Sequence, residues 1–150
     1  MSIAPLQENE PPKSWLTWAA VDRGVEHLVA HIQEQGLKFD RIIGVARGGL
    51  IPAVILSHRL GVSRLETVRV HAFDTEGHRL PEPCFGPSRP LDFPNTLVVD
   101  DIFDSGATHR LLLRTYPSAS HVALVSRCSD FQAPMSVPDG HWVVFPWECG

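Results

Sequence analysis

The chain has 150 residues, of which 43% are hydrophobic and 20% are charged, and its formal net charge is -4 at pH 7. These values are typical of one globular domain that can bury a core, and they exclude a basic nucleic-acid surface, a polybasic membrane face and a bilayer-spanning segment. The N-terminus lacks the order of a signal peptide. Cys84, Cys128 and Cys149 form neither a zinc pattern nor a complete disulfide set, so we expect a cytoplasmic protein with reduced thiols.

The first segment, residues 1–14, is rich in proline and acidic residues, which predicts a flexible N-terminal tail. One domain is expected over residues 15–150. It begins with a helix over residues 17–35, where apolar residues recur on one helical face. Thr17 is the predicted N-cap of this helix, and Gly36 is predicted to end it.

A strand–turn–helix unit follows. The apolar run 41–46 predicts a buried strand, Arg47-Gly48-Gly49 a turn, and residues 50–60 a helix. A further strand is expected over residues 65–73.

Residues 74–94 contain five prolines and two glycines, which predicts a long loop inside a compact domain. Such loops are often lids or binding loops, although a solvated surface excursion would look similar. Arg79 in this loop is placed to close over a phosphate.

The most informative stretch is a second strand–turn–helix unit. The strand 97–100 ends at Asp100 and Asp101, and a turn of small residues over 104–108 leads into a helix over 109–116. The turn exposes backbone N–H groups beside a helix N-terminus, which together can bind a phosphate. Because two carboxylates would repel a bare polyphosphate, the pattern indicates a bridging Mg²⁺ or a hydroxyl-bearing sugar.

The C-terminal part contains two more strands. One is expected over residues 121–126 and ends at Arg127, and another is expected within residues 141–150 after a loop. The alternation of elements predicts an α/β fold, with a mainly parallel sheet and helices on both faces. The carboxyl ends near Arg47, Asp100 and Arg127 should then converge at one edge of the sheet.

Residues 98–108, with the sequence VVDDIFDSGAT, closely resemble the phosphoribosyl pyrophosphate (PRPP) signature of type I phosphoribosyltransferases. The stretches 17–18, 46–52, 116–117, 142–143 and 146–147 are similar to those of the bacterial xanthine–guanine phosphoribosyltransferases, and the resemblance extends from about Lys13. It implies transfer of ribose 5-phosphate from PRPP to a 6-oxopurine, Mg²⁺ as cofactor, a mobile hood over residues 74–94, and a homodimer or homotetramer.

The resemblance also implies roles for individual residues. Asp104 would be the general base that accepts or shares the purine N7 proton, and Asp101 would hold Mg²⁺ directly or through water. A non-proline cis peptide bond would be flanked by Arg47 and Gly48. The implied PRPP-binding residues are Arg47, Gly48, Arg79, Asp100, Asp101, Asp104, Ser105, Gly106, Ala107 and Thr108.

The implied base pocket consists of Arg127, Trp142 and Val143. Trp142 would stack on the base and Val143 would give backbone contacts, although core packing would explain Trp142 equally well. Arg127 stands where the family has a lysine, and Glu148 stands where it has a shorter acid.

Three alternatives stay open: a phosphoribosyltransferase for a different base, a non-catalytic PRPP-sensing regulator, and a flavodoxin-like phosphate binder. The last would explain the phosphate loop but neither the acid pair nor the glycine turn at Arg47.

Overall fold

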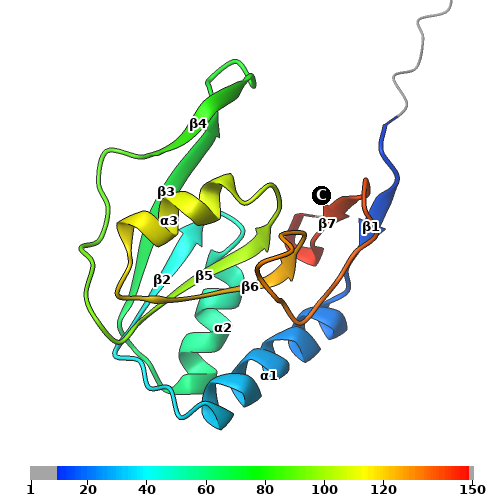
Figure 1. Cartoon of the computed structure of the whole chain (residues 1–150). Coiled ribbons are helices and arrows are strands. Elements are labelled where there is room, and N and C mark those ends of the chain that lie inside the picture. Colours follow the sequence, from blue (N-terminus) through cyan, green and yellow to red (C-terminus); the bar gives the residue numbers. More distant parts are fainter. Residues whose placement is uncertain (1–9, 149–150) are drawn as a thin grey trace, which may run out of the picture.

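The computed structural model describes residues 10–148, so Cys149 lies outside the described part (Figure 1). The chain alternates strands and helices, as predicted. In chain order the elements are β1 (Lys13–Trp15), α1 (Trp18–Glu34), β2 (Arg41–Ala46), α2 (Leu50–Leu60), β3 (Leu65–Phe73), β4 (Arg79–Phe85), β5 (Thr96–Phe103), α3 (Ala107–Thr115), β6 (Ser120–Ser126), β7 (Trp142–Val144) and the short 3₁₀ helix η1 (Pro146–Glu148).

Five strands form the main sheet in the order β4-β3-β2-β5-β6. The pairs β2–β3, β2–β5 and β5–β6 are parallel, and only the edge pair β3–β4 is antiparallel. The mainly parallel sheet predicted from the sequence is therefore confirmed.

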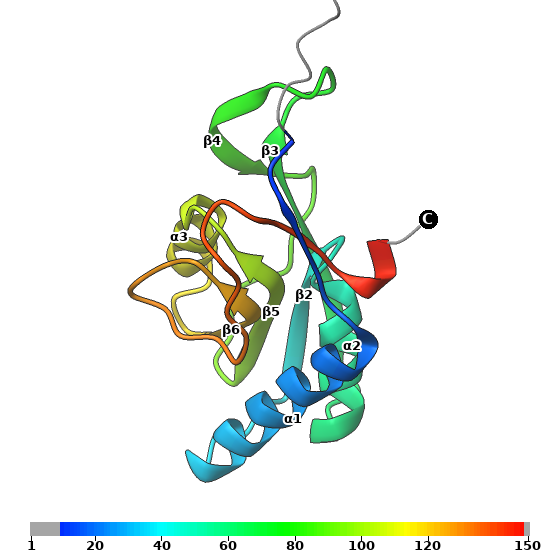
Figure 2. The ribbon, with the colours of Figure 1, turned by 90° about the vertical axis from the view of Figure 1, so that its right-hand side faces the viewer.

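Helices cover both faces of this sheet (Figure 2). On one face, α1 and α2 pack against inward side chains such as Ile42, Leu97 and Val99. On the other face, α3 covers the alternate residues of the same strands, including Ile43 and Val98. Because successive strand residues point to opposite faces, this two-sided burial explains why β2 and β5 read as continuous apolar runs.

The boundaries of α1 follow the predicted signals. The Thr17 hydroxyl accepts a hydrogen bond from the Ala20 backbone N–H at 3.1 Å, and Gly36 follows the helix with φ of 64°. No helix within residues 10–148 combines the length and the apolar character needed to cross a membrane.

The structure corrects the description of residues 74–94 as a loop throughout. Residues 79–85 form β4, and the β3–β4 hairpin extends beyond the body of the sheet (Figure 1). Pro81 and Pro83 lie within β4. They are tolerated because β4 is an edge strand, where a missing backbone donor can face solvent.

The predicted N-terminal tail over residues 1–14 also needs correction at its described end. Lys13 and Ser14 belong to β1, which pairs in parallel with β7 in a separate two-stranded sheet. The pairing satisfies backbone groups of β7, which does not join the main sheet. Residues 1–9 lie outside the described part of the chain.

Candidate functional site

Two turns meet at the carboxyl ends of the neighbouring strands β2 and β5. A Cβ atom at Gly48 would overlap the Asp101 carboxylate, and one at Gly49 would lie 2.6 Å from the Val99 carbonyl oxygen and 2.9 Å from the Asp100 Cα. Only glycine permits backbones to approach this closely. The predicted convergence of these strand ends is therefore confirmed.

The acid pair, Asp100 and Asp101, lies in surroundings that disfavour negative charge. Asp100 is 7% exposed, and its carboxylate accepts a hydrogen bond from the Asp101 N–H at 2.9 Å. Burial raises the pKa of Asp100 well above its usual value, and the negative charge of Asp101 raises it further. Burial also raises the pKa of Asp101, with a further contribution from the charge of Glu148. A bound cation, or hydroxyl groups that donate hydrogen bonds, would stabilise the negative charge of both groups.

The chemistry of this pair fits the implied Mg²⁺. Carboxylate oxygens are hard ligands, and Mg²⁺ is usually held by one or two of them together with substrate phosphates and water. Within residues 10–148 no group of three or more histidine, cysteine or acidic side chains is placed to bind a metal alone.

The turn over residues 104–108 leads into α3. Gly106 has φ of 84° and is the N-cap of α3, so Ala107 and Thr108 form the first turn of that helix. The Ser105 hydroxyl accepts hydrogen bonds from the Arg79 Nη2 at 3.1 Å and from the Ala107 N–H at 3.4 Å. The hood strand β4 thus places a cation beside the predicted phosphate loop.

Of the side chains implied for the base pocket, Arg127 contacts the phosphate loop at Asp104. Arg127 Nη1 donates to Asp104 Oδ1 at 3.0 Å, and Arg127 Nη2 donates to the His141 carbonyl oxygen. Trp142, which follows His141, is 60% exposed, whereas Val143 is buried. An exposed indole on β7 is available for stacking.

Glu148 lies close to the acid pair, but its carboxylate is engaged. It accepts a hydrogen bond from the Phe145 N–H at 2.8 Å, across the short helix η1. The longer side chain of Glu148 thus reaches back to the backbone of its own turn.

The implied cis peptide bond lies one residue earlier than expected. It joins Ala46 to Arg47, not Arg47 to Gly48, and so follows directly on the last residue of β2. The correction leaves Arg47 and Gly48 in the turn beside Asp101.

Two cavities flank the acid pair and the phosphate loop. The larger one, of about 630 Å³, is lined by Arg47, Gly48, Ile51, Asp101, Trp147 and Glu148. Ile51 and Trp147 were not predicted as lining residues, although both fall within the stretches that carry the family resemblance. The second cavity, of about 390 Å³, adjoins residues 104–106 and Arg127, and it is also lined by Cys128.

Cys128 packs against the phosphate loop. Its Sγ lies 3.5 Å from the Asp104 carbonyl oxygen, and a Cβ at Gly106 would lie 3.2 Å from it. No signal in the sequence pointed to this contact, because it joins the loop after β6 to the loop after β5. Among the described cysteines, Cys84 and Cys128 are both free thiols.

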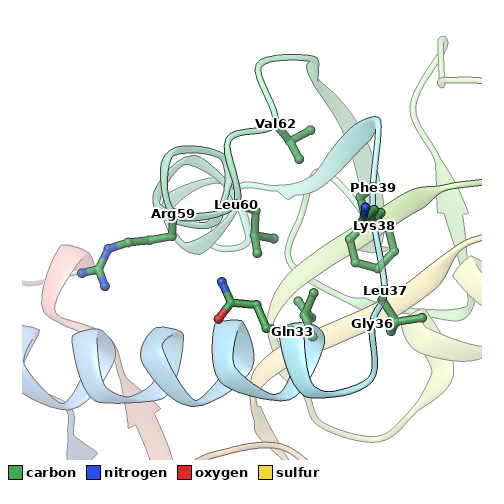
Figure 3. Close-up of a pocket in the computed structure, with 9 residues that line it drawn as sticks. Gln33, Gly36, Leu37, Lys38, Phe39, Arg59, Leu60 and Val62 are labelled. Atoms are coloured by element: carbon green, nitrogen blue, oxygen red, sulfur yellow. The ribbon is translucent and has the colours of Figure 1, made fainter.

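Another cavity, of about 450 Å³, lies at the C-terminal ends of α1 and α2 (Figure 3). Gln33, Leu60 and Phe39 are among its lining residues, and the Arg59 side chain points away from Lys38 and Phe39. None of the predicted site residues lines this cavity.

Comparisons with known proteins agree with the geometry. The sequence pattern of the phosphoribosyl transferase domain matches residues 14–130. A xanthine-guanine phosphoribosyltransferase of Gluconobacter oxydans is 31% identical, with 89% of this chain and 83% of the relative covered. The crystal structure of a purine phosphoribosyltransferase from Pyrococcus horikoshii Ot3 is 32% identical, with a TM-score of 0.72 and coverage of 92% of this chain and 95% of the other. A Neisseria gonorrhoeae hypothetical protein, crystallised with bound ppGpp, is 25% identical, with a TM-score of 0.69 and coverage of 93% and 90%.

Proposed function

The chain belongs to the phosphoribosyltransferase family, and on that premise we propose that it transfers ribose 5-phosphate from PRPP to a ring nitrogen of a 6-oxopurine and releases pyrophosphate. Guanine, xanthine and hypoxanthine are the candidate bases, and the reaction would serve purine salvage. The similarity to xanthine-guanine and purine phosphoribosyltransferases over most of the chain supports this substrate class.

One observation carries the proposal. The acid pair lies between two turns that can each hold a phosphate group: the glycine turn packed against Asp101, and the loop over residues 104–108 at the start of α3. PRPP has the matching order of groups, with a 5-phosphate and a pyrophosphate on either side of a ribose that carries two hydroxyl groups.

The phosphate loop would hold the 5-phosphate. Backbone N–H groups of residues 104–108 and the N-terminus of α3 supply donors and a positive dipole end. Arg79, which already donates to Ser105, would add a positive charge on the hood side. Asp100 and Asp101 would accept hydrogen bonds from the ribose hydroxyls.

The turn after β2 would receive the leaving pyrophosphate. Arg47 and the Gly48 backbone would stabilise the negative charge that develops as the glycosidic bond breaks. Asp101, directly or through water, and Asp100 would hold Mg²⁺, which when bound would offset the charge of the pyrophosphate. The reacting sugar carbon would pass through an oxocarbenium-like state, as in other glycosyl transfers.

The pair Arg127–Asp104 supports a 6-oxopurine over adenine. A 6-oxopurine presents an oxygen acceptor where adenine presents an amino donor. Arg127 would donate to that oxygen, and Asp104, as general base, would accept or share the neighbouring N7 proton. Trp142 would stack on the base and the Val143 backbone would contact its edge.

The assay that tests the proposal is pyrophosphate release from PRPP and Mg²⁺ with guanine, xanthine, hypoxanthine, adenine, uracil or orotate as acceptor. We expect turnover with at least one 6-oxopurine and none with adenine. Turnover only with another base would keep the reaction type and replace the substrate. PRPP binding without turnover on any base would exclude the transferase.

A second candidate is a non-catalytic regulator that binds a phosphorylated guanine nucleotide. The specific observation in its favour is the similarity to the Neisseria gonorrhoeae protein with bound ppGpp. In this case ppGpp would bind without any turnover of PRPP, which the same assay combined with calorimetry would reveal. The retained acid pair and Asp104 favour the enzyme.

The proposed enzyme would act in the cytoplasm as a homodimer or homotetramer. The exposed side chains of Trp15 and Trp18 support self-association, because large exposed apolar side chains often mark interfaces. Light scattering coupled to size exclusion would give the number of subunits.

A further inference from the structure

The strand that carries the base-side residues is held by the N-terminal segment. β7 pairs in parallel with β1, with Ser14 opposite Val143. Two flanking hydrogen bonds extend the pairing: the Trp142 N–H donates to the Pro12 carbonyl at 2.8 Å, and the Leu16 N–H donates to the Val144 carbonyl at 2.9 Å. Of the described strands, only β1 pairs with β7.

A chain of three contacts leads from this segment to the phosphate loop. The Ser14 hydroxyl and the His141 Nδ1 are 2.9 Å apart. The His141 carbonyl oxygen accepts from Arg127 Nη2, and Arg127 Nη1 donates to Asp104 Oδ1. Ser14 therefore connects to the acid of the phosphate loop through two intermediate residues.

We propose that Ser14 is a positioning residue for the base side of the site. It fixes His141, whose carbonyl orients the Arg127 guanidinium toward Asp104. Ser14 itself does not contact the loop. This inference rests on the proposed function, because it assigns Arg127 and Trp142 to the base.

The PRPP side of the site is supported differently. Arg79 contacts Ser105 from β4, and the turn after β2 packs against Asp101. Neither contact involves β1 or β7. A change at Ser14 should therefore affect binding of the base and leave binding of PRPP nearly unaffected.

The Arg127 side chain is only 19% exposed, whereas the Asp104 side chain that it contacts is 64% exposed. Losing one hydrogen bond that positions a binding residue typically weakens the binding that depends on this residue by about three- to ten-fold. Ser14→Ala is expected to raise the KM for the base by about this factor. The KM for PRPP should change by less than about two-fold, within the range of a neutral surface substitution.

Two further variants make the result specific. Ser14→Thr keeps the hydroxyl in a residue that suits a strand, and it should restore the KM for the base. Ser57→Ala removes a serine hydroxyl that bonds the Val54 carbonyl on α2, away from the site, and it should change neither KM. A Ser14→Ala enzyme with unchanged base KM, or with both KM values raised equally, would overturn the proposal.

A double-mutant cycle tests whether Ser14 acts through Arg127. Arg127→Lys cannot bridge His141 and Asp104 as a guanidinium does. If the relay is correct, adding Ser14→Ala to Arg127→Lys should raise the base KM little further. Effects that multiply would show that the two residues act independently and would contradict the relay.

Hydrogen exchange of the unliganded protein separates this proposal from the proposed function. Ser14→Ala should accelerate amide exchange over residues 141–145, by about three- to ten-fold, but not over residues 104–108. If no base is turned over and exchange still accelerates, the function fails and the positioning by Ser14 stands. If exchange is unchanged, the positioning fails whatever the activity.

Discussion

At the scale of single residues, the site concentrates negative charge where burial opposes it. Asp100 is almost completely buried beside Asp101, and burial together with this neighbour raises its pKa. An arrangement that weakens the fold is expected where charge is needed for binding, because activity and stability often conflict at such positions.

This conflict gives a prediction for Asp100→Asn. The usual aspartate pKa is 3.8, so between pH 3.8 and the raised native pKa the folded protein binds more protons than the unfolded chain. Its stability therefore falls as pH rises through this window, and the full penalty is present above it. Asn keeps the acceptor for the Asp101 N–H and removes the charge. We expect a higher Tm at pH 7, by about 2–4 °C for each kcal/mol regained, and loss of transferase activity.

Thermal unfolding at several pH values provides the check. The gain in Tm should shrink toward zero as pH falls below 3.8, where Asp100 of the parent protein becomes protonated in the unfolded state as well as in the folded state. An equal gain at pH 4 and pH 7 would mean that the effect does not come from the carboxylate charge.

Asp104 provides a second residue-scale prediction. If it is the general base, Asp104→Ala should lower kcat by about 10²–10⁴-fold, because the variant lacks the carboxylate that accepts the purine N7 proton. Binding of PRPP, measured by calorimetry, should weaken far less, since the backbone N–H groups of residues 104–108 remain. Exposed Asp139 provides a matched control, Asp139→Ala, which should leave both quantities unchanged. Equal losses in turnover and PRPP binding would leave Asp104 only a structural role.

At the scale of elements, the local signals in the sequence predicted most of the structure. Apolar periodicity, Thr17 and Gly36 fixed α1, and the motif over residues 98–108 located the acid pair and the phosphate loop. Strand β4 was missed because its two prolines argue against a strand until its edge position is known. The pairing of β1 with β7 was missed because the two partners are more than 120 residues apart, and no local pattern encodes such a contact.

The segment that returns from the hood is anchored by a buried arginine. Arg41 Nη2 donates to the Leu91 carbonyl at 2.6 Å, Nη1 donates to Glu66 at 2.8 Å, and Nε donates to Thr96 at 3.1 Å. Its guanidinium also lies 5.0 Å from the centre of the Phe93 ring. Arg41 therefore connects the core strand β2 to the residues that follow β4.

Arg41→Met should remove this anchor. Because it leaves the buried Thr96 hydroxyl and the part-buried Leu91 carbonyl and Glu66 carboxylate without this donor, we expect the free energy of unfolding to fall by about 2–3 kcal/mol. Urea denaturation provides the measurement, and limited proteolysis should cut between residues 86 and 95 faster. Arg64→Met is the matched control, since exposed Arg64 contacts the same Glu66 at 3.3 Å and should cost at most about 1 kcal/mol. Equal losses for both variants would contradict the anchoring role.

At the scale of the whole molecule, the residues that stabilise the fold and the residues of the proposed site lie on different parts of the sheet. The two apolar clusters lie on its two faces, whereas the acid pair, the phosphate loop and Arg127 lie at its carboxyl edge. The loops at that edge come from β2, β5 and β6, and the hood adds Arg79. A ligand that binds all of them at once would add contacts between these segments to those already present in the fold.

Substrate binding should therefore stabilise the entire fold. PRPP with Mg²⁺ at about 100 times its Kd would add about 2.7 kcal/mol, which corresponds to roughly 5–10 °C in Tm for a chain of this size. Mg²⁺ alone should raise Tm less, by offsetting the repulsion between Asp100 and Asp101. With EDTA, most of the shift produced by PRPP should disappear, because the acid pair would then repel the ligand.

Asp101→Asn tests which part of this stabilisation depends on the metal. The variant should lose most of the difference in Tm between Mg²⁺ and EDTA, and it should still respond to inorganic phosphate, which needs only residues 104–108 and the start of α3. If PRPP raises Tm equally in Mg²⁺ and in EDTA, the acid pair does not bind substrate through a cation. Its two carboxylates would then contact the ribose directly and accept hydrogen bonds from its hydroxyl groups.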